Sequence, residues 1–158
     1  MTIEIRQLTI KDVGLMNAWL TNFGEVFNDM KTYTEKPPTA DYLKRLLSGD
    51  SFIALAALSD EKVVGGLAAY ELQKFEQERS EIYIYDLAVS AKHRRKGVAT
   101  ALIEKLKKIA VERGAYVIFV QADTGIEDEA AIALYNRFGS CEEVLHFDIS
   151  VESADKTA

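Results

Sequence analysis

A strand–helix–strand pattern in the second half of the chain most constrains what it can fold into. "EIYIYDLAV" (81–89) is rich in β-branched and aromatic residues and predicts a strand. From Val98, apolar residues recur at three- and four-residue spacing up to Gly114, which predicts a helix that ends at a glycine. "AYVIFVQA" (115–122) is apolar throughout and predicts a second strand. Such a unit joins two parallel strands by a right-handed crossover, so the fold must contain a sheet with a helix on one face.

The rest of the chain predicts further strands and helices around this unit. Thr9 and Asp12 form the pattern of a capping box, which indicates a helix from about Lys11. The other expected elements are a strand around Ile3 and Ile5, a short helix after Thr39, a hairpin of strands 51–58 and 62–72, a helix from Asp128 to Phe138 and a strand from Val144 to Ile149. We therefore expect an α+β (mixed α/β) fold, with a central mixed β-sheet of six to seven strands flanked by about four helices.

Length and composition favour one domain. The chain has 158 residues, of which 48% are hydrophobic, and this suffices to bury a core in a single domain over 1–150. We expect the last residues, 151–158, to fray. Charges interrupt the N-terminus where a signal peptide would be apolar, and no uncharged run reaches the length of a membrane span. The single cysteine, Cys141, has no internal disulfide partner, and no spacing of Cys and His indicates a metal site. These features predict a cytoplasmic protein with neither a membrane partner nor a metal.

A basic turn precedes the helix of the strand–helix–strand unit, although the whole chain carries a formal net charge of -6. "KHRRK" (92–96) stands directly before Gly97, and no acid follows until Glu104. A helix N-terminus has unpaired N–H groups and a partial positive charge, so this turn suits a large anion such as a diphosphate. A solvated surface turn would show the same spacing, and the residues alone leave both interpretations open. Nucleic acid is a poor fit, because the acidic remainder of the chain would repel a polyanion.

This turn is one of two motifs that together resemble a known superfamily. "RRKGVA" (94–99), shortly after "LAV" (87–89), fits the pattern (Q/R)-x-x-G-x-(G/A), and "AIALYNRFG" (131–139) fits A-x-x-L-Y-x-x-x-G. The two motifs and their order are similar to those of the GNAT superfamily of acetyl-CoA-dependent N-acetyltransferases. Asp128 stands where that superfamily often has an asparagine, and Ser140 where it often has an aromatic residue.

A closer resemblance covers nearly the whole chain, from about Ile3 to Ile149. The stretches 52–58, 74–103, 114–123 and 142–149 resemble the aminoglycoside 3-N-acetyltransferases within that superfamily. The resemblance implies transfer of an acetyl group from acetyl-CoA to an aminoglycoside, at the 3-amine of its deoxystreptamine ring, with antibiotic resistance as the consequence. It also implies that the main chain of 87–89 stabilises the developing oxyanion. The residues that the resemblance assigns to the coenzyme are Leu87, Ala88, Val89, Arg94, Arg95, Lys96, Gly97, Val98, Ala99 and Thr100.

Attack of an amine on a thioester needs a group that accepts a proton and a group that donates one. An acid inside an otherwise apolar strand is costly to bury without a purpose, so Asp86 is the first candidate for the base, directly or through water. Further candidates are Glu81, at the start of the same strand, and Asp123, at the end of the next strand. Tyr135 falls on the tyrosine of the second motif and is the candidate that protonates the departing thiolate. Each has a structural alternative, because the acids can be hydrogen-bonded or solvated and the tyrosine can be packed in a core.

An aminoglycoside is a polycation, so its groove should be acidic and should contain aromatic hydroxyl groups. The segment "FGEVFNDMKTY" (23–33) is expected to form one wall. Tyr83 and Tyr85 can line the groove beside Asp86 only if a bulge interrupts their strand, because neighbouring residues of a strand alternate between faces. The candidate substrate-binding residues are Glu25, Asp29, Tyr83, Asp86, Asp123 and Asp148.

Other functions fit the same motifs. The amine can belong to another cation, such as a polyamine or a protein amino group, and a coenzyme-A-binding regulatory domain without turnover would keep the basic turn. Cys141, His93 and His146 do not suit a nucleophile and base pair, so direct transfer without an acyl-enzyme is expected. The residues leave open which aminoglycosides are accepted and whether the protein is a monomer or a homodimer.

Overall fold

The computed structural model describes residues 2–152. The chain divides into two compact units, Met1–Gln121 and Ala122–Ala158. That both belong to a single domain over 1–150 stays a prediction. The expected fraying of 151–158 falls on residues that, from 153 onward, lie outside the described part of the chain.

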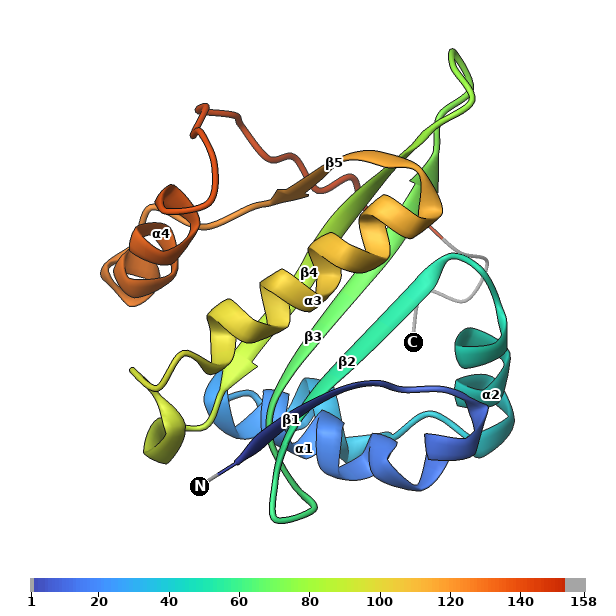
Figure 1. The fold of residues 1–158 in the computed structure, drawn as a ribbon, viewed down its shortest axis with the longest axis vertical. Helices are drawn as coiled ribbons and strands as arrows, with labels where there is room; N and C mark the ends of the chain where they lie inside the picture. Colours follow the sequence, from blue (N-terminus) through green and yellow to red (C-terminus); the bar gives the residue numbers. More distant parts are fainter. Residues whose placement is uncertain (1, 153–158) are drawn as a thin grey trace. The chain divides into compact units, whose positions relative to one another are not determined.

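A five-stranded mixed sheet forms the centre of the first unit (Figure 1). Its strands stand in chain order: β1 (Ile3–Gln7), β2 (Phe52–Ser59), β3 (Lys62–Gln73), β4 (Ser80–Val89) and β5 (Ala115–Val120). Neighbours from β1 to β4 pair antiparallel, and β4 pairs parallel with β5 through the helix α3 (Val98–Arg113). The expected strand–helix–strand unit is confirmed, since two parallel strands need such a crossover between them.

Helices cover both faces of this sheet. On one face lies α1 (Met16–Val26), whose Trp19 and Phe23 approach Gly66 of β3 so closely that a Cβ there would lie 2.6 Å from the indole nitrogen of Trp19. Val98 of α3 lies against the neighbouring Gly65. Because adjacent residues of a strand point to opposite faces, α1 and α3 cover opposite faces, here named the α1 face and the α3 face.

The helices before β2 differ from expectation in one respect. The capping box of Thr9 and Asp12 is present, but it begins the short 3-10 helix η1 (Ile10–Leu15), and α1 starts only after it. A glycine and two β-branched residues inside η1 lower the preference for an α-helix there. Thr39 caps α2 (Ala40–Ser48) as expected, with its hydroxyl oxygen accepting a backbone N–H in the first turn.

A buried ion pair ties the far end of β3 to the end of α3. The Glu71 side chain is only 4% exposed, and its carboxylate accepts hydrogen bonds from Arg113 Nη1 at 2.7 Å and from Ser80 Oγ at 2.6 Å. Arg113 Nη1 also donates to the carbonyl of Asp50, just before β2. One guanidinium therefore joins three segments that are distant in the sequence.

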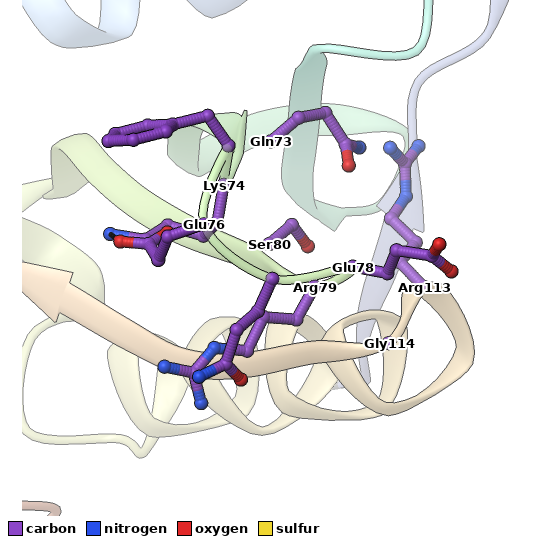
Figure 2. Close-up of a pocket in the computed structure, with 10 residues that line it drawn as sticks. Gln73, Lys74, Glu76, Glu78, Arg79, Ser80, Arg113 and Gly114 are labelled. Carbon is purple, nitrogen blue, oxygen red and sulfur yellow. Dashed lines mark ion pairs between the residues drawn. The ribbon is translucent and has the colours of Figure 1, made fainter.

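A hollow of about 540 Å³ lies beside this pair, between the β3–β4 loop and the end of α3 (Figure 2). Its cations are already engaged. Lys74 Nζ lies 3.4 Å from a carboxylate oxygen of Glu76, and the Arg79 guanidinium lies 3.7 Å from the centroid of the Tyr116 ring. Each of these two cations therefore has a partner, an acid for Lys74 and an aromatic ring for Arg79.

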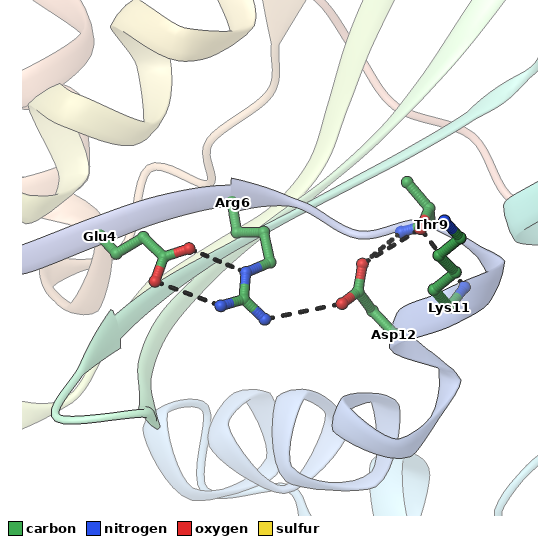
Figure 3. A network of polar contacts seen from close by, with 5 residues as sticks. All are labelled: Glu4, Arg6, Thr9, Lys11 and Asp12. Atoms are coloured by element: carbon green, nitrogen blue, oxygen red, sulfur yellow. Dashed lines mark hydrogen bonds and ion pairs between the residues drawn. The ribbon is translucent and has the colours of Figure 1, made fainter.

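A polar network ties β1 to the start of η1 (Figure 3). Arg6 Nε donates to Glu4 at 2.8 Å, and Arg6 Nη1 lies 3.6 Å from Asp12 Oδ1. The second oxygen of Asp12 accepts the backbone N–H of Thr9 at 2.9 Å. Exposed pairs of this kind contribute at most about 1 kcal/mol, so the network shapes the turn between strand and helix more than it stabilises the fold.

The second unit contains a short 3-10 helix, η4 (Ile126–Asp128), followed by α4 (Glu129–Asn136), close to the expected helix. The strand expected from Val144 to Ile149 is wrong, because residues 140–152 form neither helix nor strand. Among the described residues the sheet thus has five strands rather than six to seven, while the mixed α/β class is confirmed. A strand exists only where its backbone pairs with a neighbour, and an alternating side-chain pattern does not supply that partner.

Candidate active site

Strand β4 loses one of its two neighbours halfway along its length. Its pairing with β5 ends at Ile84, opposite Val120, whereas its pairing with β3 continues to Val89, opposite Gly65. Within the unit Met1–Gln121, the stretch Tyr85–Val89 therefore has no strand on its β5 side. Main-chain N–H groups on such an edge can bind a ligand or stabilise an oxyanion. The stretch includes the coenzyme candidates Leu87, Ala88 and Val89.

A β-bulge at Tyr85 decides where the side chains of this stretch point. Ile84 pairs with Ala69 and Asp86 pairs with Ala68, so Tyr85 has no residue opposite it. Residues directly opposite each other share a face, and Ala68 belongs to the core that α1 covers. The bulge thus turns Asp86 to the α1 face, whereas regular alternation would put it on the α3 face with Ile84. From the sequence, Asp86 can share a groove with Tyr83 and Tyr85 only if a bulge interrupts their strand, and this bulge is present.

On the α1 face Asp86 meets a tyrosine from a distant part of the chain. The π-helical turn η2 (Lys31–Glu35) carries Tyr33, whose hydroxyl donates to Asp86 Oδ2 over 2.7 Å. Asp86 is half-buried, and desolvation raises the pKa of its carboxyl group, an effect that the hydrogen bond from Tyr33 opposes. Asp86 joins no ion pair with any residue that the structure describes. A half-buried carboxylate with a raised pKa and no cation beside it is suited to accept a proton.

A row of aromatic rings crosses the sheet next to this carboxylate. It consists of Phe52, Tyr70, Tyr85, Tyr83 and Phe119, and we call it the aromatic row. Successive ring centroids are 5.5, 5.8, 5.8 and 4.7 Å apart, and the last two rings stack within 3° of parallel. Tyr85 is 60% exposed, so the row is open to a ligand. Aromatic faces attract ammonium groups, and the row therefore suits a cationic ligand with flat apolar patches.

The basic turn follows β4 and contains two left-handed residues. Arg95 (φ 60°) and Gly97 (φ 79°) both have left-handed conformations, and turns of this kind direct successive N–H groups into one space. Gly97 is the N-cap of α3, with no side-chain cap and no acid in the first turn. A Cβ added at Gly97 would meet no atom within 4 Å, so the space over the turn is open. Arg94, Arg95 and Lys96 are exposed and pair with no acid in residues 2–152. This donor set fits a phosphorylated ligand.

Glu81 lies at the other end of β4. Its carboxylate accepts hydrogen bonds from the Tyr116 hydroxyl at 2.5 Å and from Lys74 Nζ at 3.3 Å, and these bonds lower its pKa, the tyrosine most strongly. At about 3.3 Å per residue, the strand carries Glu81 roughly 16 Å from Asp86. The structure therefore separates the two candidate bases, and Glu81 has the contacts of a structural acid.

One of the predicted substrate acids, Asp29, acts on the tyrosine that contacts Asp86. Asp29 Oδ1 accepts the backbone N–H of Thr32 at 3.1 Å, which holds the start of η2. A hydrogen bond with the Thr32 side chain and, after it, this backbone bond lower the pKa of Asp29. The charge of Asp29 also acts on Tyr33. Glu25 is exposed near the end of α1. Both acids belong to the segment 23–33 that was expected to form one wall.

Three further candidates belong to the second unit. Asp148 Oδ1 lies 2.8 Å from His146 Nε2, and the backbone N–H of Asp123 donates to Asp128 Oδ2 over 2.8 Å. Tyr135 lies in the last turn of α4. The roles assigned to Tyr135, Asp123 and Asp148 stay predictions.

Sequence reasoning missed Tyr33, Tyr70 and Phe119. Tyr33 lies within the expected wall segment, but its partner stands 53 positions away, and no local pattern connects the two. Tyr70 and Phe119 lie within strand patterns that suggest only packing. An aromatic residue paired across from another strand's aromatic residue becomes visible only once the register of the sheet is known.

The described part of the chain contains neither a membrane-spanning helix nor a metal-binding cluster of side chains. No helix within residues 2–152 combines the length and the apolar character that a membrane span requires. In the same range, no three His, Cys, Asp or Glu side chains cluster as a metal site would need.

Comparisons with known proteins agree on one family. A model of the acetyltransferase (GNAT) family matches residues 15–140. The crystal structure of an aminoglycoside acetyltransferase from an uncultured soil metagenomic sample is 65% identical, with a TM-score of 0.95, and the match covers 96% of this chain and 100% of that one. A second aminoglycoside acetyltransferase from such a sample, crystallised with sisomicin, is 31% identical, with a TM-score of 0.86 and coverages of 95% and 97%.

More distant relatives occur among curated proteins. N-acetyltransferase 8 of Homo sapiens is 31% identical over 100 residues, which are 63% of this chain and 43% of that protein. N-acetyltransferase 8B of Rattus norvegicus is 30% identical over 100 residues, which are 63% and 44% of the two chains. The chain thus matches less than half of the length of these curated relatives.

Proposed function

The chain belongs to the GNAT acetyltransferase family, and we propose that it transfers an acetyl group from acetyl-CoA to the 3-amine of the deoxystreptamine ring of an aminoglycoside. The observation that carries this proposal is the open stretch Tyr85–Val89, which bears Asp86 and stands between the aromatic row and the basic turn. The substrate class is supported by the aminoglycoside acetyltransferase that is 65% identical to nearly the whole chain. Antibiotic resistance is the expected consequence, because an acetylated amine no longer carries a positive charge.

The basic turn binds the diphosphate of the coenzyme in this proposal. Main-chain N–H groups at the start of α3, around Gly97, donate to the phosphate oxygens, and Arg94, Arg95 and Lys96 supply positive charge. Acetyl-CoA supplies the acetyl group as a thioester. The open edge of β4 from Leu87 to Val89 donates N–H groups to the thioester oxygen, which gains negative charge during the attack.

Two side chains of this protein move protons in the proposed reaction. The amine nitrogen forms a bond to the acetyl carbon as the carbon–sulfur bond breaks. Asp86 accepts the proton that the amine loses, and Tyr135 donates its hydroxyl proton to the departing sulfur. Asp86 then releases its proton to solvent, and Tyr135 regains one from solvent, so each cycle leaves the protein unchanged.

In this proposal the aromatic row and several acids hold the substrate. Ring faces of Tyr83 and Tyr85 stack on the sugar and attract its ammonium groups, as aromatic rings do for cations. Glu25, Asp29, Asp123 and Asp148 add negative charge, which raises the local concentration of a polycation. The amine that reacts is the one next to Asp86, and it must lose its proton before it can attack.

A thiol-release assay with acetyl-CoA and a panel of amines tests this proposal. The panel contains gentamicin-like aminoglycosides, a deoxystreptamine compound already acetylated at the 3-amine, spermidine and a lysine-containing peptide. We expect thiol release with the aminoglycosides but not with the blocked compound, and NMR of the product should show the acetyl group on the 3-amine. Turnover of spermidine or the peptide, without turnover of any aminoglycoside, would show that the substrate is another class of amine. Binding of acetyl-CoA without turnover of any amine would favour a regulatory domain.

A further inference from the structure

The hydrogen bond between Tyr33 and Asp86 indicates a role that neither motif suggested. We propose that Tyr33 is a positioning residue, which fixes the carboxylate of Asp86 so that one of its oxygens faces the substrate amine. This inference rests on the proposed function, since it requires that Asp86 act on an amine. Tyr33 itself touches neither the amine nor the acetyl group.

Tyr33 is held by its own segment, independently of Asp86. Its ring lies 5.8 Å from that of Phe23, at 28° from parallel, and 5.9 Å from that of Phe27. The Thr34 hydroxyl donates to the carbonyl of Met30 at 2.6 Å and closes the η2 turn around it. Packing therefore sets the direction of the Tyr33 hydroxyl before any hydrogen bond forms. Burial and the bond to Asp86 raise the pKa of Tyr33, so the hydroxyl stays protonated and remains a donor at neutral pH.

Tyr33 is the one described residue that restrains the Asp86 carboxylate. Its hydroxyl engages Oδ2, and no side chain or main-chain group in residues 2–152 donates to Oδ1. The charge of Asp86 acts on Tyr33 from η2, Tyr70 from β3 and Tyr83 from β4. Two further titratable groups, Asp29 and Tyr85, act on Tyr33. None of them is a cation. Rotation of a carboxylate about its last bond is otherwise soft, so the hydrogen bond from Tyr33 decides where Oδ1 points.

The chemistry of the transfer explains why this orientation matters. As the new carbon–nitrogen bond forms, the proton of the amine passes to Asp86 Oδ1, while Tyr33 keeps its own proton and continues to donate to Oδ2. A hydrogen bond to an ionised acceptor is stronger than one to a neutral acceptor. The hydroxyl of Tyr33 therefore favours the carboxylate over the carboxylic acid, and keeps Asp86 able to accept a proton even though burial raises its pKa.

The test compares Tyr33→Phe with Tyr42→Phe. Tyr33→Phe keeps the packed ring and removes only the hydroxyl, and Tyr42 is an exposed residue of α2 whose hydroxyl bonds to no described residue. We expect kcat to fall about 10- to 100-fold in Tyr33→Phe, the cost of one hydrogen bond to a charged group, with the KM for acetyl-CoA unchanged. The acid limb of the kcat/KM profile should move to higher pH, because the bond that lowered the pKa of Asp86 is gone. Tyr42→Phe should match the wild type in both respects.

A double variant separates positioning from a general structural effect. If Tyr33 acts through Asp86, then Tyr33→Phe should have almost no further effect on kcat in an Asp86→Asn background. A full, additive loss in that background would overturn the inference, as would a wild-type rate and pH profile in Tyr33→Phe alone. Carbon-13 NMR titration of the Asp86 carboxyl group reads the same contact without turnover, and an unchanged titration midpoint in Tyr33→Phe would also contradict it.

The outcome for Tyr33 can be told apart from the outcome for the proposed substrate. If the wild type acetylates spermidine or the peptide but no aminoglycoside, the proposed substrate class is wrong. Tyr33→Phe is then compared with wild type on the amine that reacts. If wild-type protein acetylates no amine at all, both proposals fall. If aminoglycosides react and Tyr33→Phe is unaffected, only the positioning role falls.

Discussion

At the scale of single residues, two opposing effects act on the pKa of Asp86. Its position on the α1 face removes part of its solvation, which raises the pKa of the carboxyl group, and the Tyr33 hydroxyl partly restores the preference for the charged form. A fully solvated acid would be a weaker base, and a fully buried one would be neutral at physiological pH. The half-buried position with one hydrogen bond lies between these extremes.

Replacing Asp86 by asparagine should separate stability from activity. The folded protein keeps the Asp86 proton over a pH range, above the ordinary pKa of 3.8, in which the unfolded chain has already lost it. The contribution of Asp86 to stability therefore falls as pH rises through this range, and the ionised group is a cost at pH 7. We expect Asp86→Asn to melt at a higher temperature than wild type at pH 7, with the gap narrowing as pH falls towards 4. Its kcat should drop about 10²- to 10⁴-fold. Calorimetry measures the melting temperature, and the thiol-release assay measures kcat. A lower Tm for Asp86→Asn than for wild type at pH 7 would contradict the destabilising effect of the ionised carboxylate.

Tyr135 should matter for turnover and not for coenzyme binding. A phenol with an ordinary pKa of about 10 can protonate a thiolate whose conjugate acid has a pKa near 8.5 as the sulfur becomes charged. We expect Tyr135→Phe to lower kcat about 100-fold, at the lower end of what general acids contribute. The Kd for acetyl-CoA, measured by calorimetry, should stay within about twofold, since an interaction made mainly in the transition state adds little to ground-state affinity. A wild-type kcat would remove the proposed role.

At the scale of elements, the site depends on how β4 ends and α3 begins. The bulge at Tyr85 brings Asp86 to the α1 face, the loss of pairing with β5 opens the main chain, and the left-handed turn at Arg95 and Gly97 makes the helix N-terminus accessible. Each is an irregularity of the backbone. Continued pairing with β5 would have satisfied the main-chain N–H groups of β4 that now form an open edge.

Two glycines at opposite ends of α3 allow a matched test of the turn. Gly97 (φ 79°) and Gly114 (φ 75°) both have left-handed backbones, and an added Cβ would meet no atom within 4 Å at either position. Alanine should therefore cost about 1–2 kcal/mol of stability at each. Only Gly97→Ala should also raise the Kd for acetyl-CoA, because its methyl group enters the space over the N-terminus. Equal Kd values for the two variants, by calorimetry, would remove the turn from coenzyme binding.

At the scale of the whole molecule, the buried pair of Glu71 and Arg113 joins segments that the sequence keeps far apart. Arg113→Met leaves a carboxylate that is 4% exposed without its cation, and we expect a loss of about 3–5 kcal/mol in the free energy of unfolding. Arg6→Met breaks the exposed pair with Glu4 and should cost at most about 1 kcal/mol. Urea denaturation measures both.

Partial recovery of stability should follow when Glu71→Gln is added to Arg113→Met, because the uncompensated charge is then gone. The kcat of the folded Arg113→Met protein should equal that of wild type, since the pair lies at the end of β3 away from Asp86. A loss of less than 1 kcal/mol in Arg113→Met would mean that the carboxylate reaches water or another donor.

The sequence alone determined the order of the elements in the first unit and the position of the basic turn. These follow from local signals: the spacing of apolar residues in α3, the capping residues Thr9 and Thr39, and the glycine at the start of the helix. Asp86 also stood out locally, because an acid within an apolar strand is rare. The strand expected over 144–149 shows the limit of such signals, since the side-chain pattern was present and the backbone partner was not.

Only the tertiary structure decided which groups meet at the site. The bulge depends on the register between β3 and β4, the open edge depends on where β5 stops, and the contact of Tyr33 with Asp86 depends on the packing of η2 against α1. Register and packing minimise the free energy of the whole fold, so residues far apart in the chain choose them jointly. A local pattern reports the preference of one segment and carries no information about which partner another segment will offer.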